Sequence, residues 1–226
     1  MSHIVSFSIS APGAGKGTQA ELLAKRKGFI HFDTGRHMER ILHSPGAEND
    51  PILKREQIHW DTGILTTPAW ALQLVREATN KMVQDGYDIA YSGSPRTYFE
   101  TFGNEKTVGL IATFTEAYGK ENVHFVRLDV SEEVSIERNS NRVVCSICSL
   151  PILANANTTA CAFCGGKPET RILDDPEIIK VRLKEYRERT LPIVEQLKKE
   201  SYHIIEIDGA PAPYKVHEEI LKQLNL

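Results

Sequence analysis

Residues 10–18 read SAPGAGKGT, and their types and spacing suit the binding of a phosphate group. Three glycines, Gly13, Gly15 and Gly17, let the backbone turn its N–H groups inward around phosphate oxygens. Lys16 can then neutralise the outer phosphates of a nucleotide, and the Thr18 hydroxyl can bind magnesium. The alternative is a glycine-rich turn without a ligand, but a GKGT run at this place favours a phosphate site.

The four cysteines form a second group with chemical potential: Cys145-x2-Cys148, twelve residues, then Cys161-x2-Cys164. Two such pairs have the spacing of a tetrahedral zinc site with four thiolate ligands, although iron or cobalt could bind the same ligands. A redox pair is the alternative, but redox motifs of this spacing usually open a helix, and turn-like residues flank these cysteines. Because four thiolates leave no open coordination position, the site is expected to be structural.

Short apolar runs alternate with amphipathic stretches along the chain, which predicts an α/β fold with a parallel sheet. The phosphate loop lies between the first expected strand and the first expected helix. Strands are expected at residues 3–10, 29–32, 88–91, 122–130 and 201–208. Helices are expected at residues 18–27, 36–43, 52–60, 68–86, 101–118, 131–142, 176–190 and about 213–224. Residues 143–172 fit neither type and are interpreted as a small inserted module.

Composition excludes several classes of protein. A chain of 226 residues suits one domain with insertions, and a net charge of −3 argues against a general nucleic-acid binder. No apolar stretch reaches the length of a membrane span, and the first ten residues lack the pattern of a signal peptide. The sequence therefore predicts a cytoplasmic protein, expected to be a monomer, without a nucleic-acid or membrane partner.

Four features together carry a resemblance: APGAGKGTQA at residues 11–20, DTG at 33–35, GSPRT at 93–97 and the cysteine module. The chain resembles the adenylate kinases, and more broadly the nucleoside monophosphate kinases, over essentially its whole length. The resemblance implies a P-loop core of residues 1–32, 67–140 and 174–226. It also implies an acceptor-nucleotide domain at 33–66 and a zinc-binding lid at 141–173. The implied reaction is phosphoryl transfer from Mg-ATP to AMP, giving two ADP.

The resemblance also implies roles for single residues. The residues expected to bind ATP are Gly13, Ala14, Gly15, Lys16, Gly17, Thr18, Arg138, Arg142 and Pro211. The residues expected to bind AMP are Thr34, Gly35, Arg40, Ile64, Leu65, Thr66, Gly93, Ser94, Pro95, Arg96, Glu100, Arg171 and Arg182. The catalytic group is expected to be Lys16, Arg96, Arg138, Arg171 and Arg182. Physical chemistry supports this set, because phosphoryl transfer needs in-line positioning and charge stabilisation more than a side-chain base.

Three serines depart from the family pattern. Ser10 replaces the first glycine of the loop, and is tolerated only if its backbone φ is negative. Ser92 replaces an aspartate that steadies magnesium through its waters, so slower chemistry or weaker metal use is expected. Ser94 replaces a bulky residue beside the acceptor, which loosens the packing there. Ser10, Ser92 and the displaced arginine of the acceptor domain motivate an alternative, a catalytically weak nucleotide sensor, against which the retained arginines argue.

The acceptor side departs twice more. The family has an arginine where this chain has Glu39, and either Arg36 or Arg40 could reach the same place, with Arg40 favoured. Glu100 stands where adenylate kinases use glutamine to read adenine. An ionised carboxylate only accepts hydrogen bonds, which suits guanine better, so GMP is an alternative acceptor to AMP. The remaining histidines show no ligand spacing and are interpreted as surface or packing residues.

Overall fold

The computed structural model describes residues 3–148, 150–152 and 158–226. Its centre is a sheet of five parallel strands in the order β10-β6-β1-β3-β2. The strands are β1 (Val5–Ser8), β2 (Ile30–Phe32), β3 (Ile89–Tyr91), β6 (Val123–Asp129) and β10 (His203–Asp208). The prediction of an α/β fold with a parallel sheet is therefore confirmed.

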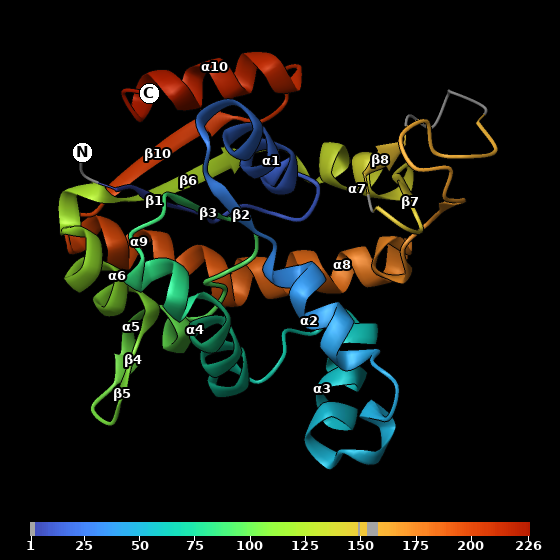
Figure 1. The fold of residues 1–226 in the computed structure, drawn as a ribbon, viewed down its shortest axis with the longest axis horizontal. Helices are drawn as coiled ribbons and strands as arrows, with labels where there is room; N and C mark the ends of the chain where they lie inside the picture. The colour runs from blue at the N-terminus through green and yellow to red at the C-terminus, as the bar shows by residue number, and fades with distance from the viewer. Residues whose placement is uncertain (1–2, 149, 153–157) are drawn as a thin grey trace.

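Helices cover both faces of this sheet, as Figure 1 shows. Successive side chains of a strand point to opposite faces, so Phe125 packs in one apolar cluster and Val126 in the other. The first cluster joins the sheet to α4, α6 and α9, and the second joins it to α1 and α10. The core helices are α1 (Lys16–Lys27), α4 (Pro68–Gln84), α5 (Tyr98–Phe102), α6 (Leu110–Tyr118), α7 (Glu132–Ser140), α8 (Pro176–Glu185), α9 (Leu191–Lys199) and α10 (Pro213–Gln223). Shorter helical segments are η2 (Lys120–Asn122), η4 (Ile172–Asp174) and the π-helical η5 (Tyr186–Thr190), which joins α8 to α9.

A small helical unit follows β2 and projects from the core (Figure 1). It consists of α2 (Thr34–Leu42), η1 (Ala47–Asn49) and α3 (Pro51–Asp61). Asp33 caps α2 by accepting a hydrogen bond from the Arg36 N–H at 3.0 Å, and Asp50 caps α3 in the same way. Met38, Leu42 and Trp60 form a separate apolar cluster with Leu173, so the unit packs against the entry to α8.

The cysteine module contains a three-stranded antiparallel sheet in the order β8-β7-β9. Its strands are β7 (Val143–Cys145), β8 (Pro151–Ile152) and β9 (Pro168–Glu169), where neither element type was expected. Residues 149 and 153–157 of the predicted lid lie outside the described residues.

The expectation of one helix over residues 101–118 is wrong. α5 ends at Phe102, and a hairpin of β4 (Gly103–Asn104) and β5 (Thr107–Val108) separates it from α6. Gly103 has a positive φ of 74°, and the Asn104 side chain accepts hydrogen bonds from the N–H groups of Lys106 and Thr107 at 3.0 and 2.9 Å. This turn chemistry overrides the helical spacing of the apolar residues. Along the described ranges, no helix combines the length and apolar character needed to cross a bilayer.

Candidate active site

The loop between β1 and α1 has the geometry of a phosphate cradle. Gly13 and Gly15 adopt positive φ values of 74° and 98°. A Cβ atom on Gly13 would approach the Asn139 side chain to 2.6 Å and the Ser135 carbonyl to 2.8 Å, so only glycine fits. The Lys16 ammonium donates to the carbonyls of Ser10 and Ala11 at 2.9 and 2.7 Å. Lys16 therefore folds back over its own loop.

Ser10 causes no backbone strain. Among the described residues other than glycine, positive φ occurs at Ser201 and Asn225 alone. The Ser10 hydroxyl accepts a hydrogen bond from the Leu128 N–H at 2.7 Å, which ties the loop to β6. A glycine could not make this contact, so the substitution adds an anchor.

A cavity of about 730 Å³ runs from the phosphate loop past the carboxyl ends of β2 and β3 to the cysteine module. Ligands of open parallel sheets bind at this edge. Most residues expected to bind nucleotides line it: Gly13, Ala14, Gly15, Lys16, Gly17, Thr18, Thr34, Gly35, Ile64, Leu65, Thr66, Gly93, Arg96, Glu100, Arg138, Arg142, Arg171, Arg182 and Pro211. Three others, Arg40, Ser94 and Pro95, are not in its lining.

Cations crowd the centre of the cavity. Burial lowers the pKa of Lys16 well below its ordinary range, and the nearby charges of Arg96, Arg182 and Arg142 lower it further. Burial, then Arg96 and Arg142, lower the pKa of Arg182 to about 9. The direction of these shifts indicates that the positively charged groups lie close together, in a part of the cavity that is largely shielded from water. A polyanion between them would relieve the repulsion.

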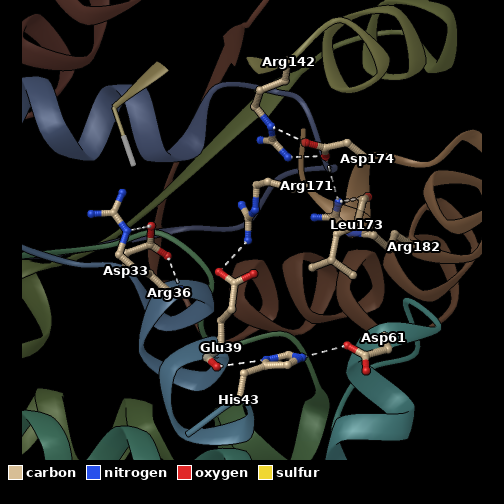
Figure 2. A network of polar contacts seen from close by, with 10 residues as sticks. All are labelled: Asp33, Arg36, Glu39, His43, Asp61, Arg142, Arg171, Leu173, Asp174 and Arg182. Carbon is tan, nitrogen blue, oxygen red and sulfur yellow. Dashed lines mark hydrogen bonds and ion pairs between the residues drawn. The ribbon is translucent and has the colours of Figure 1, made fainter. Parts of the chain in front are cut away.

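Carboxylates hold several of these arginines in place (Figure 2). Asp174 is buried, and it accepts hydrogen bonds from Arg142, one of them at 2.8 Å. Arg182 donates to the Leu173 carbonyl at 2.9 Å and lies 3.8 Å from Asp174. Arg171 reaches across from the lid return to Glu39 of α2 at 3.3 Å. These contacts fix the positions of the three guanidinium groups in the wall of the cavity.

The end of the cavity that was predicted to bind the acceptor nucleotide contains a buried hydroxyl without a partner in the described ranges. The Thr34 hydroxyl is buried, yet it finds no hydrogen-bond partner among the described residues. The Leu65 N–H donates to Glu185 at 3.0 Å, which fixes the segment at 64–66. Arg36 lines the cavity, whereas Arg40 is exposed outside it. The geometry therefore favours Arg36 over the expected Arg40.

Glu100 is buried at the end of the acceptor side, 3% exposed. Its carboxyl accepts hydrogen bonds from the Thr97 hydroxyl at 2.7 Å and from the Arg96 N–H at 3.3 Å. Burial raises the pKa of Glu100, although these contacts oppose the shift. The side chain points into the protein rather than to solvent.

Arg138, which was predicted to bind ATP, donates to the carbonyls of Gly209 and Ala210 at 2.8 and 2.9 Å. Pro211 lines the cavity beside them. The guanidinium plane of Arg138 therefore lies next to the turn where an adenine ring is expected.

The four cysteine sulfur atoms lie within 4.8 Å of one another. The Sγ atoms of Cys145 and Cys164 are 3.4 Å apart, and those of Cys148 and Cys161 are 3.7 Å apart. Both distances are too long for a disulfide bond. Thiolates around a tetrahedral zinc stand about 3.8 Å apart, since each Zn–S bond is about 2.3 Å. Hydrogen bonds from the backbone N–H groups of Cys148 and Ile147 lower the pKa of Cys145 to about 6. The donor set and its spacing fit zinc.

Two residues of the cavity wall were not identified from the sequence. His31 was interpreted as a surface or packing residue, but its Nε2 lies 2.7 Å from the Ser92 hydroxyl and its Nδ1 lies 3.1 Å from Glu21. The hydrogen bond with His31 lowers the pKa of Glu21. No spacing in the sequence could reveal the hydrogen bonds that join Glu21, His31 and Ser92, because these residues belong to α1, β2 and the segment after β3.

Comparison with known proteins identifies the family. The family model described as "Adenylate kinase" matches residues 8–202. The adenylate kinase of Petrotoga mobilis is 31% identical over 220 residues, covering 94% of this chain and 94% of that protein. The adenylate kinase of Mycoplasma capricolum is 29% identical over 222 residues, covering 96% and 95%. That of Caldicellulosiruptor saccharolyticus is 28% identical over 224 residues, covering 96% and 97%. The resemblance drawn from the phosphate loop, the GSPRT segment and the cysteine module is confirmed, and the chain belongs to the adenylate kinase family.

Proposed function

We propose that the protein catalyses reversible phosphoryl transfer from Mg-ATP to AMP, giving two ADP. The observation that carries this proposal is the cavity that joins a phosphate loop to a cluster of inward-facing cations. Membership of the adenylate kinase family supports the same reaction. Two nucleotides meeting end to end would bring their phosphates together where Lys16, Arg96 and Arg182 face one another.

We assign the three parts of the chain as the resemblance suggests: residues 33–66 to the acceptor nucleotide, 141–173 to the lid, and the remainder to the core. Lys16 and the loop N–H groups would bind the ATP phosphates, with Arg138 beside the donor base. Arg96 would hold the acceptor phosphate, with Arg36 in place of the expected Arg40. Arg142, Arg171 and Arg182 would surround the group in transfer.

In this arrangement the chain's own groups act by position and charge. The arginine forks can bind equatorial oxygens in pairs, and so hold the two phosphates in line. Closure of the acceptor domain and lid would exclude water and suppress wasteful hydrolysis of ATP. Magnesium, when bound with ATP, would neutralise charge on the outer phosphates. The Thr18 hydroxyl at the exposed edge of the loop suits an ion that keeps most of its waters.

We favour AMP over GMP as the acceptor. Membership of the adenylate kinase family supports this acceptor. Burial raises the pKa of Glu100, and the Thr97 hydroxyl and the Arg96 N–H already donate to its two oxygens.

We further propose that the four cysteines bind a structural zinc ion. Their geometry supports this assignment, and four free thiols suit a reducing compartment such as the cytoplasm. The zinc would hold a module that has only short strands of its own.

The deciding experiment is diphosphate formation from Mg-ATP with AMP, GMP, CMP and UMP in parallel, on metal-replete protein. Rapid turnover with AMP is expected. A preference for GMP would make Glu100 a carboxylate reader of guanine. Measurable ATP binding without turnover on any acceptor would contradict the proposed reaction and favour a nucleotide sensor.

A further inference from the structure

The side chains of Glu21, His31 and Ser92 form a hydrogen-bonded chain in the wall of the nucleotide cavity. Ser92 follows β3, which lies between β1 and β2, and its hydroxyl lies 2.7 Å from His31 Nε2. His31 Nδ1 lies 3.1 Å from Glu21 Oε2. All three residues line the cavity together with Lys16 and Thr18. The resemblance described in the sequence analysis implies an aspartate at the position of Ser92, so these three side chains lie where a negative charge is expected.

The chemistry of the three groups sets the direction of the hydrogen bonds. An ionised carboxylate only accepts, so the Nδ1 proton of His31 is donated to Glu21. In the tautomer of the imidazole that carries its proton on Nδ1, Nε2 has a lone pair and accepts the Ser92 proton. The Ser92 oxygen keeps its own lone pairs for a donor in the cavity. Each hydrogen bond polarises the next, which makes this oxygen more negative than that of an isolated serine.

The solvent exposure of the three side chains increases from Ser92 through His31 to Glu21. Ser92 is 7% exposed, the His31 side chain 12%, and the Glu21 side chain 40%. A histidine that served packing alone would need no carboxylate partner such as Glu21, because solvent could form the hydrogen bond with its Nδ1. The arrangement places a full charge at the surface, where its desolvation cost is small, and brings its effect inward through two hydrogen bonds.

We propose that Glu21 and His31 are positioning residues that hold the Ser92 oxygen as an acceptor for the hydrated magnesium of the donor nucleotide, in place of the missing aspartate. The inference rests on the proposed function. It gives Ser92, which carries no charge of its own, a route to the contact with the waters of the metal that the resemblance assigns to an aspartate.

The experiment compares ATP affinity with and without magnesium, by titration calorimetry, in the unmodified protein and in Glu21→Gln. Glutamine removes the charge but fills the same space on a half-exposed helix position, so the fold is preserved. Loss of such an outer contact weakens metal-dependent binding by about tenfold. Mg-ATP affinity should fall by about that factor in the variant, while metal-free ATP affinity is unchanged.

Two further variants separate this role from general electrostatics. Glu21 also pairs with Lys25 at 3.3 Å. The substitution Lys25→Gln breaks that ion pair and leaves the hydrogen bonds from Glu21 through His31 to Ser92 in place. The ratio of Mg-ATP to metal-free affinity should be unchanged in Lys25→Gln. Ser92→Asp supplies the charge directly, and in that background Glu21→Gln should lose most of its effect.

The outcomes are distinct. An unchanged affinity ratio in Glu21→Gln, or an equal loss in the Ser92→Asp background, would overturn the inference. Phosphorylated Ser92 after incubation with ATP alone, found by mass spectrometry, would also overturn it, because the serine would then be a nucleophile. Absence of turnover in the unmodified protein would instead contradict the proposed function, which the calorimetric ratio does not test.

Discussion

At the scale of single residues, Arg96 links the two halves of the proposed site. It lines the cavity, and its carbonyl accepts a hydrogen bond from Thr190 at 2.8 Å, which anchors the backbone beneath the guanidinium group. Burial lowers the pKa of Arg96 and the Glu100 charge opposes that shift, so the arginine is held as a cation by a neighbour that is itself buried.

Arg96→Ala should lower turnover by about a thousandfold, since removal of an arginine from a phosphoryl-transfer site costs this much. ATP affinity should remain nearly unchanged, because the acceptor side supplies the contact. Steady-state kinetics and ATP titration measure the two effects. The exposed Arg76 lies outside the cavity lining and donates a hydrogen bond to the Val108 carbonyl, so Arg76→Ala serves as the control with normal turnover. Normal turnover in Arg96→Ala would remove Arg96 from the site.

Glu100 gives the second prediction at this scale. Burial raises its pKa in the folded state, so the folded protein binds a proton more tightly than the unfolded chain. The stability that this proton contributes is complete below the unfolded pKa of about 4.3 and is lost as pH rises through the folded pKa. The contribution of Glu100 to the free energy of unfolding should therefore fall over this window. The pH profile of Glu100→Gln should lack this fall and so differ from that of the unmodified protein.

Urea unfolding at a series of pH values measures whether the contribution of Glu100 to the free energy of unfolding falls as pH rises. Glu116→Gln, at an exposed position of α6, is the matched control and should keep the slope of the unmodified protein. Parallel profiles for the unmodified protein and Glu100→Gln would show that Glu100 does not carry this proton.

At the scale of elements, the hairpin between α5 and α6 depends on one glycine. A Cβ atom on Gly103 would lie 1.9 Å from the Thr107 carbonyl, at a positive φ of 74°. Gly46 has a similar φ of 88° but open space around it. Gly46→Ala should cost about 1–2 kcal/mol of unfolding free energy from backbone strain alone.

Gly103→Ala should cost about 3 kcal/mol or more, because the ψ of −149° at Gly103 lies outside the left-handed region, where only glycine is readily accommodated, and the steric clash adds to this greater strain. Urea unfolding of the two variants measures the difference directly. Equal losses would mean that the hairpin shifts to accept the methyl group at no cost.

The elements also show how far the sequence can be taken. The phosphate loop, the capped helices and the cysteine pairs are local patterns, and each is found close to its expected position. The break at Gly103 was missed because Phe102 and Leu110 pack on the same apolar cluster, so their spacing imitates one continuous helix. The contact between His31 and Ser92 joins residues 61 positions apart, and only the pairing of β2 with β3 brings them together.

At the scale of the whole molecule, the cysteine module and the five-stranded core are separate packing units. The four sulfur atoms gather in a module whose strands have two or three residues each. Zinc removal by a chelator should lower the melting temperature by about 5 °C or more, while the core keeps its own apolar clusters.

Calorimetry before and after verified metal loss measures this change. Cys164→Ser supplies the control, since a protein with three thiolates should melt at the lower temperature and respond little to the chelator. An unaltered melt of the unmodified protein after metal loss would argue against a structural zinc.

The crowding of Lys16, Arg96, Arg142 and Arg182 has a practical consequence for anyone handling this protein. A folded chain that keeps cations close together is less stable alone than with a multivalent anion between them. Tripolyphosphate at millimolar concentration, too dilute to act as a general stabilising salt, should raise the melting temperature where equal ionic strength of chloride does not. Melting temperatures taken in phosphate buffer would then belong to a partly liganded protein, and those taken in chloride-based buffers to the free one.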